Sequence, residues 1–252
     1  MKTAKETRPA QPRHCATRRS LLKSATGIAA LGASGAAFLG APGISYAAAM
    51  SKDKRDKLTP DQILEAMKQG NERFRTGKML RHDYLGQKRA TIAGQYPAAV
   101  ILSCIDSRAP AEIILDAGIG DTFNARIAGN VANDDLLGSL EFACAVAGAK
   151  VVLVMGHTSC GAIKGAIDGA ELGNLTGLLN KIKPAVDATH YDGERTSKNA
   201  AFVDEVAGTN VRLTTAAIRQ RSTVLAALEK DGKVRIVGSM YHLSGGRVEL
   251  FS

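Results

Sequence analysis

PAAVILS at residues 97–103 and KVVLVMG at residues 150–156 are short apolar stretches rich in β-branched residues, and each ends at a polar motif. Runs of this length and composition predict buried strands. The first ends at CIDSR (104–108) and the second at HTSC (157–160). Because ligands of an open parallel α/β sheet bind beyond the carboxyl ends of its strands, we expect both motifs at one edge of the same sheet.

The rest of the chain alternates between predicted strands and helices, an order typical of a parallel sheet with helices on its faces. We expect an α/β fold: a single domain with a central parallel β-sheet flanked by helices, plus an amino-terminal helical arm. The helix of the arm starts at Thr59 as N-cap, with Pro60 in first position and Gln62 closing a capping box, and ends at Gly77. Residues 51–57 are charged and predict a mobile lead-in. The other predicted elements are strands at 122–127, 234–240 and 247–251, helices near 109–117, 136–147, 161–167, 175–186, 202–220 and 223–230, and a loop at 189–198.

The amino-terminal segment has the features of an export signal. Residues 17–23, TRRSLLK, fit the twin-arginine pattern, and an Ala/Gly-rich run follows. Residues 45–47 (SYA) and 47–49 (AAA) both fit the small-x-small rule for signal cleavage, after Ala47 or alternatively after Ala49. The run is too short and Gly-rich for a stable membrane anchor. We therefore expect the twin-arginine export machinery to deliver the protein to the periplasm or outside the cell.

This leader sets the predicted domain organisation and most of the charge. We expect a cleaved signal peptide at 1–47, a linker and helical arm at 48–94, and an α/β domain with both polar motifs at 95–252. The chain has 33 basic and 24 acidic residues and a formal net charge of +9, but seven basic residues and one acidic residue fall within 1–47. The remainder carries only +3, which does not indicate a nucleic-acid partner.

Two thiols and one imidazole follow the two strands. Cys104, His157 and Cys160 form a two-sulfur, one-nitrogen set, and three protein ligands are typical of a catalytic zinc with one open position. The alternative is a Cys104–Cys160 disulfide, because an exported protein meets an oxidising compartment. A disulfide would leave His157 without a role, so we expect one Zn²⁺ per chain. We assign Cys144 to a buried helix face, without a function.

Asp106 and Arg108 lie beside the first thiol. A guanidinium that grips a carboxylate through two hydrogen bonds keeps the carboxylate ionised and fixes its direction. An ionised Asp106 could accept a hydrogen bond from a zinc-bound hydroxide in an open, active state. It could instead become the fourth zinc ligand in a closed, inactive state. The alternative for this pair is an ordinary surface ion pair.

These motifs resemble those of the β-class carbonic anhydrases, and the resemblance covers nearly all of the chain after the leader. The family's C-x-D-S-R is found at 104–108, its H-x-x-C-G at 157–161 and its R-x-A-G-N at 126–130. SLEF at 139–142, the Asn-Val pair at 210–211 and the segment 241–248 also resemble family motifs. Together the motifs are far more specific than either metal motif alone.

The resemblance implies a fold, an assembly and site residues. It implies a parallel sheet flanked by helices in a homodimer or a dimer-based higher oligomer, with the amino-terminal helix laid on the neighbour. Cys104, His157 and Cys160 would bind zinc, and Asp106 with Arg108 would be the catalytic pair. Gln95 matches a glutamine that donates to bound substrate from across the dimer interface; alternatively, it is an ordinary polar loop residue.

The implied reaction is the reversible hydration of carbon dioxide to bicarbonate and a proton by attack of zinc-bound hydroxide. His82 and Tyr84 are candidate proton relays, although ordinary surface roles are the simpler interpretation. The alternative functions are a carbonyl sulfide or carbon disulfide hydrolase on the same scaffold, and a non-catalytic zinc- or bicarbonate-binding protein. A thiol–disulfide protein is a further alternative, but the chain lacks the C-x-x-C spacing of that chemistry.

Overall fold

The computed structural model describes residues 49–251, so the predicted leader lies outside the described residues. A five-stranded sheet with the order β2-β1-β3-β4-β5 forms the centre of this part of the chain. β1 to β4 run parallel, and β5 pairs antiparallel with β4. The strands are β1 (Ala99–Ser103), β2 (Thr122–Arg126), β3 (Val151–His157), β4 (Arg235–Tyr241) and β5 (Val248–Leu250).

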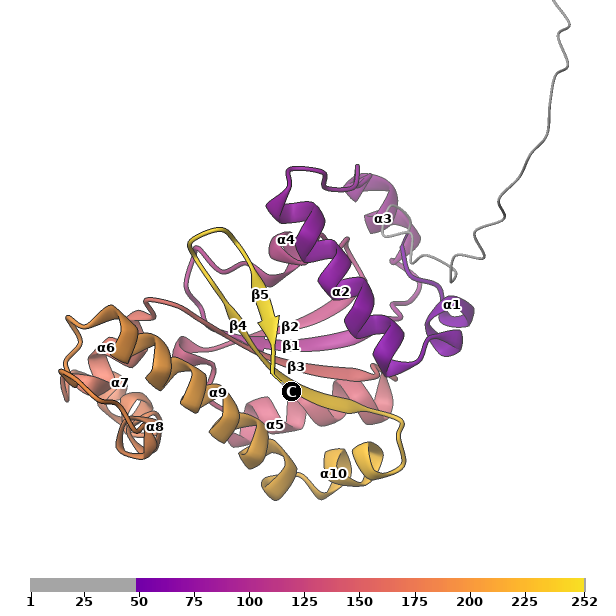
Figure 1. The fold of residues 1–252 in the computed structure, drawn as a ribbon. Helices are drawn as coiled ribbons and strands as arrows, with labels where there is room; N and C mark the ends of the chain where they lie inside the picture. Colours follow the sequence, from indigo (N-terminus) through magenta and orange to yellow (C-terminus); the bar gives the residue numbers. More distant parts are fainter. Residues whose placement is uncertain (1–48, 252) are drawn as a thin grey trace, which may run out of the picture. The chain divides into compact units, whose positions relative to one another are not determined.

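Helices connect the strands and cover both faces of the sheet (Figure 1). None of the helices within residues 49–251 combines the length and apolar character that a membrane span requires. They are α1 (Lys52–Lys57), α2 (Pro60–Arg75), α3 (Tyr84–Ala90), α4 (Ala111–Ile114), the 3₁₀ turn η1 (Ala128–Asn130), α5 (Asp134–Glu141), the π-helical turn η2 (Phe142–Val146), α6 (Gly161–Ile167), α7 (Gly173–Leu179), α8 (Lys183–Ala188), α9 (Ala200–Arg221) and α10 (Thr223–Lys230).

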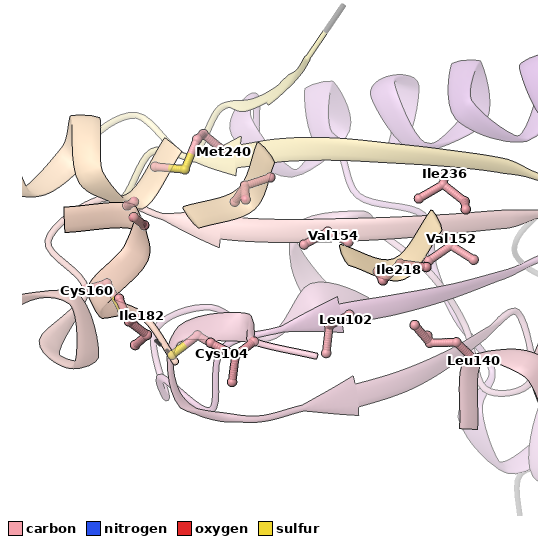
Figure 2. Close-up of a cluster of buried hydrophobic side chains, with 14 of the residues drawn as sticks. Leu102, Cys104, Leu140, Val152, Val154, Cys160, Ile182, Ile218, Ile236 and Met240 are labelled. Carbon is pink, nitrogen blue, oxygen red and sulfur yellow. Dashed lines mark hydrogen bonds between the residues drawn. The ribbon is translucent and has the colours of Figure 1, made fainter. Parts of the chain in front are cut away.

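Alternation along the strands divides the core into two layers. Successive strand side chains point to opposite faces, so Ile101 and Leu153 join the α2 side while Leu102 and Val154 join the α9 side. Both central strands are buried along their whole length, as expected for a parallel sheet covered on both faces. Figure 2 shows part of the layer under α9, including Leu140, Val152, Ile218 and Ile236. The predicted α/β fold is confirmed.

The amino-terminal segment differs from its prediction at residues 51–57. Residues 51–57 form α1 instead of a mobile lead-in, because buried Arg55 donates to the carbonyl of Ala147 at 2.5 Å and Lys150 donates to that of Leu58 at 2.7 Å. The α2 capping box is present as expected. Helix α2 packs Ile63 and Met67 against its own sheet, on the face opposite α9, while its contact with a neighbouring subunit stays a prediction.

Two other helical predictions are wrong in detail. The single helix expected at 175–186 is split into α7 and α8, with Pro184 in the first turn of α8. Proline lacks the N–H that would continue the hydrogen-bond ladder, and its ring clashes with the preceding turn. The helix expected at 136–147 turns into the π-helical η2, which carries the buried Cys144. Helix α3 was not expected, and the loop at 189–198 contains no helix, as expected.

Asp121, in the turn before β2, is a buried carboxylate whose ionisation costs stability. Its side chain accepts a hydrogen bond from the Gly118 N–H at 2.8 Å, and the residue is 1% exposed. Burial raises the pKa of Asp121 to about 6. The folded state therefore holds this proton at pH values where the unfolded chain has released it. The contribution to stability falls as the pH rises from about 4 to about 6.

We expect Asp121→Asn to stabilise the protein relative to wild type at pH 7.5 but not at pH 4.5, because asparagine stays neutral. The upward shift predicts that this gain in unfolding free energy is roughly 2 kcal/mol larger at pH 7.5 than at pH 4.5, measurable by urea unfolding. Asp192→Asn, in an exposed loop, serves as the control and should show little pH-dependent difference. A difference for Asp121→Asn that is the same at both pH values would contradict the prediction.

Candidate metal centre

The parallel register of β1 and β3 brings the two polar motifs together. Ser103 pairs with Met155, so Cys104, directly after β1, lies beside the last residues of β3, where His157 ends the strand. Cys160 is the N-cap of α6, one short turn later. Figure 2 shows Cys104 and Cys160 side by side near Ile182, at the carboxyl ends of the strands. The structure thus brings all three predicted ligands to one place.

The spacing of the three ligand atoms suits a tetrahedral zinc. The atoms lie within 4.8 Å of one another, and the sulfurs of Cys104 and Cys160 are 4.0 Å apart. Two sulfurs bound to one zinc at tetrahedral angles would lie about 3.8 Å apart. Both cysteines are free, which is inconsistent with the alternative disulfide.

His157 presents one ring nitrogen to this cluster. Its Nδ1 lies 2.9 Å from the carbonyl oxygen of Thr158, which can only accept, so Nδ1 carries the proton. The Nε2 atom is buried and has no hydrogen-bond partner in the structure. A buried acceptor without a partner is costly, and a metal ion would satisfy it. The donor set therefore fits zinc.

The two buried thiols lie within hydrogen-bond distance of each other, at 4.0 Å between their sulfurs. A hydrogen bond from Cys160 lowers the pKa of Cys104 well below its usual value, and His157 and the Gly129 N–H, 3.4 Å from Sγ, add to this effect. The same hydrogen bond, with burial, raises the pKa of Cys160. These opposite shifts favour a single thiolate in the metal-free pair, and a bound metal would displace the remaining proton.

Asp106 and Arg108 form the predicted two-pronged contact. The Nε and Nη2 atoms of Arg108 donate to Oδ1 and Oδ2 of Asp106 at 3.0 and 2.8 Å, and the Arg108 backbone N–H donates to Oδ1 at 2.9 Å. These hydrogen bonds hold the pKa of Asp106 well below its usual range, and those from the Arg108 guanidinium contribute most. Asp106 Oδ2 lies 3.8 Å from His157 Nε2. An ionised carboxylate therefore faces the metal-ligand cluster with both oxygens held by Arg108.

Arg126 at the end of β2 supports this loop, a role that sequence analysis did not assign. Its Nε donates to the carbonyl of Cys104 at 2.9 Å, and its Nη2 donates to that of Asp106 at 2.6 Å. Arg126 thereby ties the loop after β1 to the neighbouring strand. The available signal was its position at the start of the R-x-A-G-N segment, inside the strand predicted at 122–127.

Three other predicted residues do not join the cluster. Gln95 is exposed and lies before β1, at the amino ends of the strands and so at the opposite edge of the sheet. His82 is buried, with its Nε2 3.0 Å from Asp116 and its ring stacked on Tyr84. Asp116 also accepts from Arg73 at 2.6 Å. His82 is thus neither a surface residue nor part of the site, but links the segment before α3 to the loop after α4.

Comparisons with known proteins agree with this geometry. The family model for carbonic anhydrase matches residues 99–248 of this chain. The carbonic anhydrase of Mycolicibacterium smegmatis is 38% identical over 195 residues, covering 77% of this chain and 94% of that protein. The solved β-carbonic anhydrase of Aspergillus fumigatus has a TM-score of 0.57 at 27% identity, covering 66% and 80% of the two chains. A tetrameric β-carbonic anhydrase of Sordaria macrospora has a TM-score of 0.58 at 23% identity, covering 66% and 85%.

The matched region includes both polar motifs and the strands that carry them. It spans more than half of the chain, and the bacterial relative extends the similarity to most of both sequences. The solved structures share the arrangement of a mostly parallel sheet between helices. On these grounds the chain belongs to the β-class carbonic anhydrase family.

Proposed function

We propose that Cys104, His157 and Cys160 bind one zinc ion and that Asp106 and Arg108 form the catalytic pair. Membership of the family makes zinc-dependent, reversible hydration of carbon dioxide to bicarbonate the activity of this chain. One observation carries the assignment of residues. Three converging metal-ligand atoms lie beside a carboxylate that a guanidinium keeps ionised.

Each residue of the pair has a defined task. When bound, zinc lowers the pKa of a coordinated water to about 7 and so supplies a nucleophile at neutral pH. Ionised Asp106 can only accept hydrogen bonds, so it holds the O–H of the nucleophile and directs the oxygen lone pair at carbon dioxide. Arg108 keeps Asp106 ionised and prevents its carboxylate from rotating onto the metal. Closure, with Asp106 as fourth ligand, would require these two hydrogen bonds to break.

Stopped-flow hydration of carbon dioxide by the zinc-loaded protein from pH 6.5 to 9 tests the activity. We expect fast turnover that rises with pH and is lost on chelation of zinc. Asp106→Asn should bind zinc normally but lower kcat by about 100-fold or more, because an amide neither carries the charge nor only accepts hydrogen bonds.

Asp192→Asn makes the same chemical change in an exposed loop and should leave turnover unchanged. Full activity of Asp106→Asn would rule out the proposed role of the carboxylate. No turnover by the zinc-loaded wild type at any pH would move the assignment to carbonyl sulfide, carbon disulfide or a binding role.

We also propose that the active unit is a homodimer, alone or within a larger oligomer, in which Gln95 serves the partner's site. Gln95 lies before the amino end of β1 and Cys104 directly after its carboxyl end, so the five residues of the strand, about 16 Å in length, separate Gln95 from the metal centre of its own chain. Edge strand β2 and exposed apolar residues near it, including Ile105, Ile113 and Ile119, offer a surface for a second copy. The Sordaria macrospora relative is tetrameric.

A mixture of two impaired variants distinguishes action within one chain from action across an interface. Gln95→Ala and Asp106→Asn homodimers should both be weak. If Gln95 acts across the interface, a dimer of one subunit of each type contains one complete site. Co-expression at equal amounts should then recover up to about a quarter of wild-type activity, since half of the dimers are mixed and one of their two sites is complete. Action within one chain, or no role for Gln95, would give no such recovery above the average of the two variants.

We further propose that residues 1–47 export the protein through the twin-arginine route to the periplasm or outside the cell. The twin-arginine motif at 17–23 and the small residues around Ala47 support this proposal. Replacement of Arg18 and Arg19 by lysine should keep the protein in the cytoplasm of a host with this export system. Cell fractionation provides the measurement, and amino-terminal sequencing should find the mature chain starting at Ala48. Export of the double-lysine variant would contradict the proposed route.

A further inference from the structure

Helix α9, the longest helix of the described chain, packs against the elements that surround the metal centre. It packs on β3 and α6, which flank the loop from His157 to Cys160, and on the η1 turn, whose Gly129 contacts Cys104. Two of its polar side chains, Asp204 and Asn210, each hydrogen-bond to the backbone of a different loop. Neither side chain touches the ligand atoms themselves, and neither was assigned a role from sequence.

Asp204 holds the loop between His157 and Cys160. Its Oδ1 accepts a hydrogen bond from the Ser159 backbone N–H at 2.8 Å. Ser159 has φ +55°, a left-handed conformation that is unfavourable for a residue with a Cβ atom. This conformation lets two ligands separated by only two residues face the same point. Because Arg108 Nη2 lies 3.4 Å from the Ser159 carbonyl, the same residue also adjoins the Asp106–Arg108 pair.

Asn210 holds the turn that contacts Cys104. Its Nδ2 donates to the Gly129 carbonyl at 2.7 Å, and the residue is buried. Gly129 has φ +69°, and a Cβ added there would lie 2.5 Å from a side-chain atom of Ile182. The N–H of Gly129 in turn points at Cys104 Sγ, 3.4 Å away. Asn210 thus orients the residue that donates to the first thiolate.

We propose that Asp204 and Asn210 are positioning residues through which α9 preorganises the metal centre. Asp204 maintains the left-handed Ser159 between two ligands, and Asn210 maintains the Gly129 donor to the third. Ligands already held in place lose less freedom when the metal binds, so these contacts raise zinc affinity. The proposal rests on the assignment of Cys104, His157 and Cys160 as zinc ligands.

Zinc affinity, measured by competition with a chromogenic chelator, tests the proposal independently of turnover. We expect Asp204→Ala and Asn210→Ala to weaken zinc binding about 10- to 100-fold. Asp204→Asn keeps an oxygen acceptor for the Ser159 N–H and should stay within about three-fold of wild type. The visible spectrum of the cobalt-substituted protein should change for the two alanine variants and not for Asp204→Asn.

Thr215→Val is the matched control for packing of α9. Thr215 is buried on the same helix, and its hydroxyl donates only to the Arg212 carbonyl of that helix at 2.8 Å. The control should bind zinc with wild-type affinity. This should hold even if Thr215→Val lowers the unfolding temperature as much as the alanine substitutions do, because it leaves the hydrogen bonds to the ligand loops intact. Equal zinc affinities for Thr215→Val and both alanine variants would overturn the proposal. A loss in Asp204→Asn as large as in Asp204→Ala would overturn the hydrogen-bond role of Asp204 in favour of its charge.

A second substitution tests the role of the Ser159 backbone directly. Glycine adopts the left-handed conformation without strain, so Ser159→Gly should restore much of the zinc affinity lost in Asp204→Ala. It should restore none of the loss in Asn210→Ala, which acts on the other loop. An equal recovery of zinc affinity in Asp204→Ala and Asn210→Ala would contradict the proposal that the two residues hold different loops. The zinc affinity of Cys160→Ser tests the ligand assignment separately. If Cys160 is not a zinc ligand, this variant should bind zinc as tightly as wild type, whatever the affinities of the Asp204 and Asn210 variants.

Discussion

The parallel pairing of β1 with β3 is the constraint on which the metal centre depends. Its register places the end of β1 beside the end of β3, and each strand continues into a segment with metal-ligating side chains. A shift by one residue would turn every side chain of a strand to the other face and separate Cys104 from His157. Burial of both strands on both faces resists such a shift, because it would break the packing of the α2 and α9 layers together.

The metal centre combines buried sulfur ligands with a carboxylate at the rim of the site, and the two need different surroundings. The sulfurs belong to the apolar layer under α9, where a low dielectric strengthens each electrostatic contact. An unpaired charge would be costly there, so backbone N–H groups and the hydrogen bond from Cys160 offset the thiolate charge. Asp106 instead lies at the rim, where exposed Arg108 keeps it ionised and the reaction's small substrate and product can enter and leave.

The sequence predicted much of this arrangement because several signals were local. A buried strand that stops at a cysteine, a capping box at Thr59 and a helix end at Gly77 each depend on neighbouring residues, and the structure has them in place. Predictions failed where contacts between distant residues decided the local structure, or where a proline that ends a helix was not taken into account. The charged segment 51–57 became helical through Arg55 and Lys150, and Pro184 divided a helix whose apolar spacing had indicated continuity.

The linear chain specified the strands, the three candidate metal ligands and the Asp106–Arg108 pair, since strand ends and the two-residue spacing of Asp106 and Arg108 are properties of short segments. Tertiary structure alone settled which groups support them. Asp204 and Asn210 lie more than 40 residues beyond the loops that they hold, and the two residues reach those loops only because α9 packs across the sheet. Gln95 is separated from its own metal centre for the same kind of reason: a strand carries its two ends to opposite edges of the sheet.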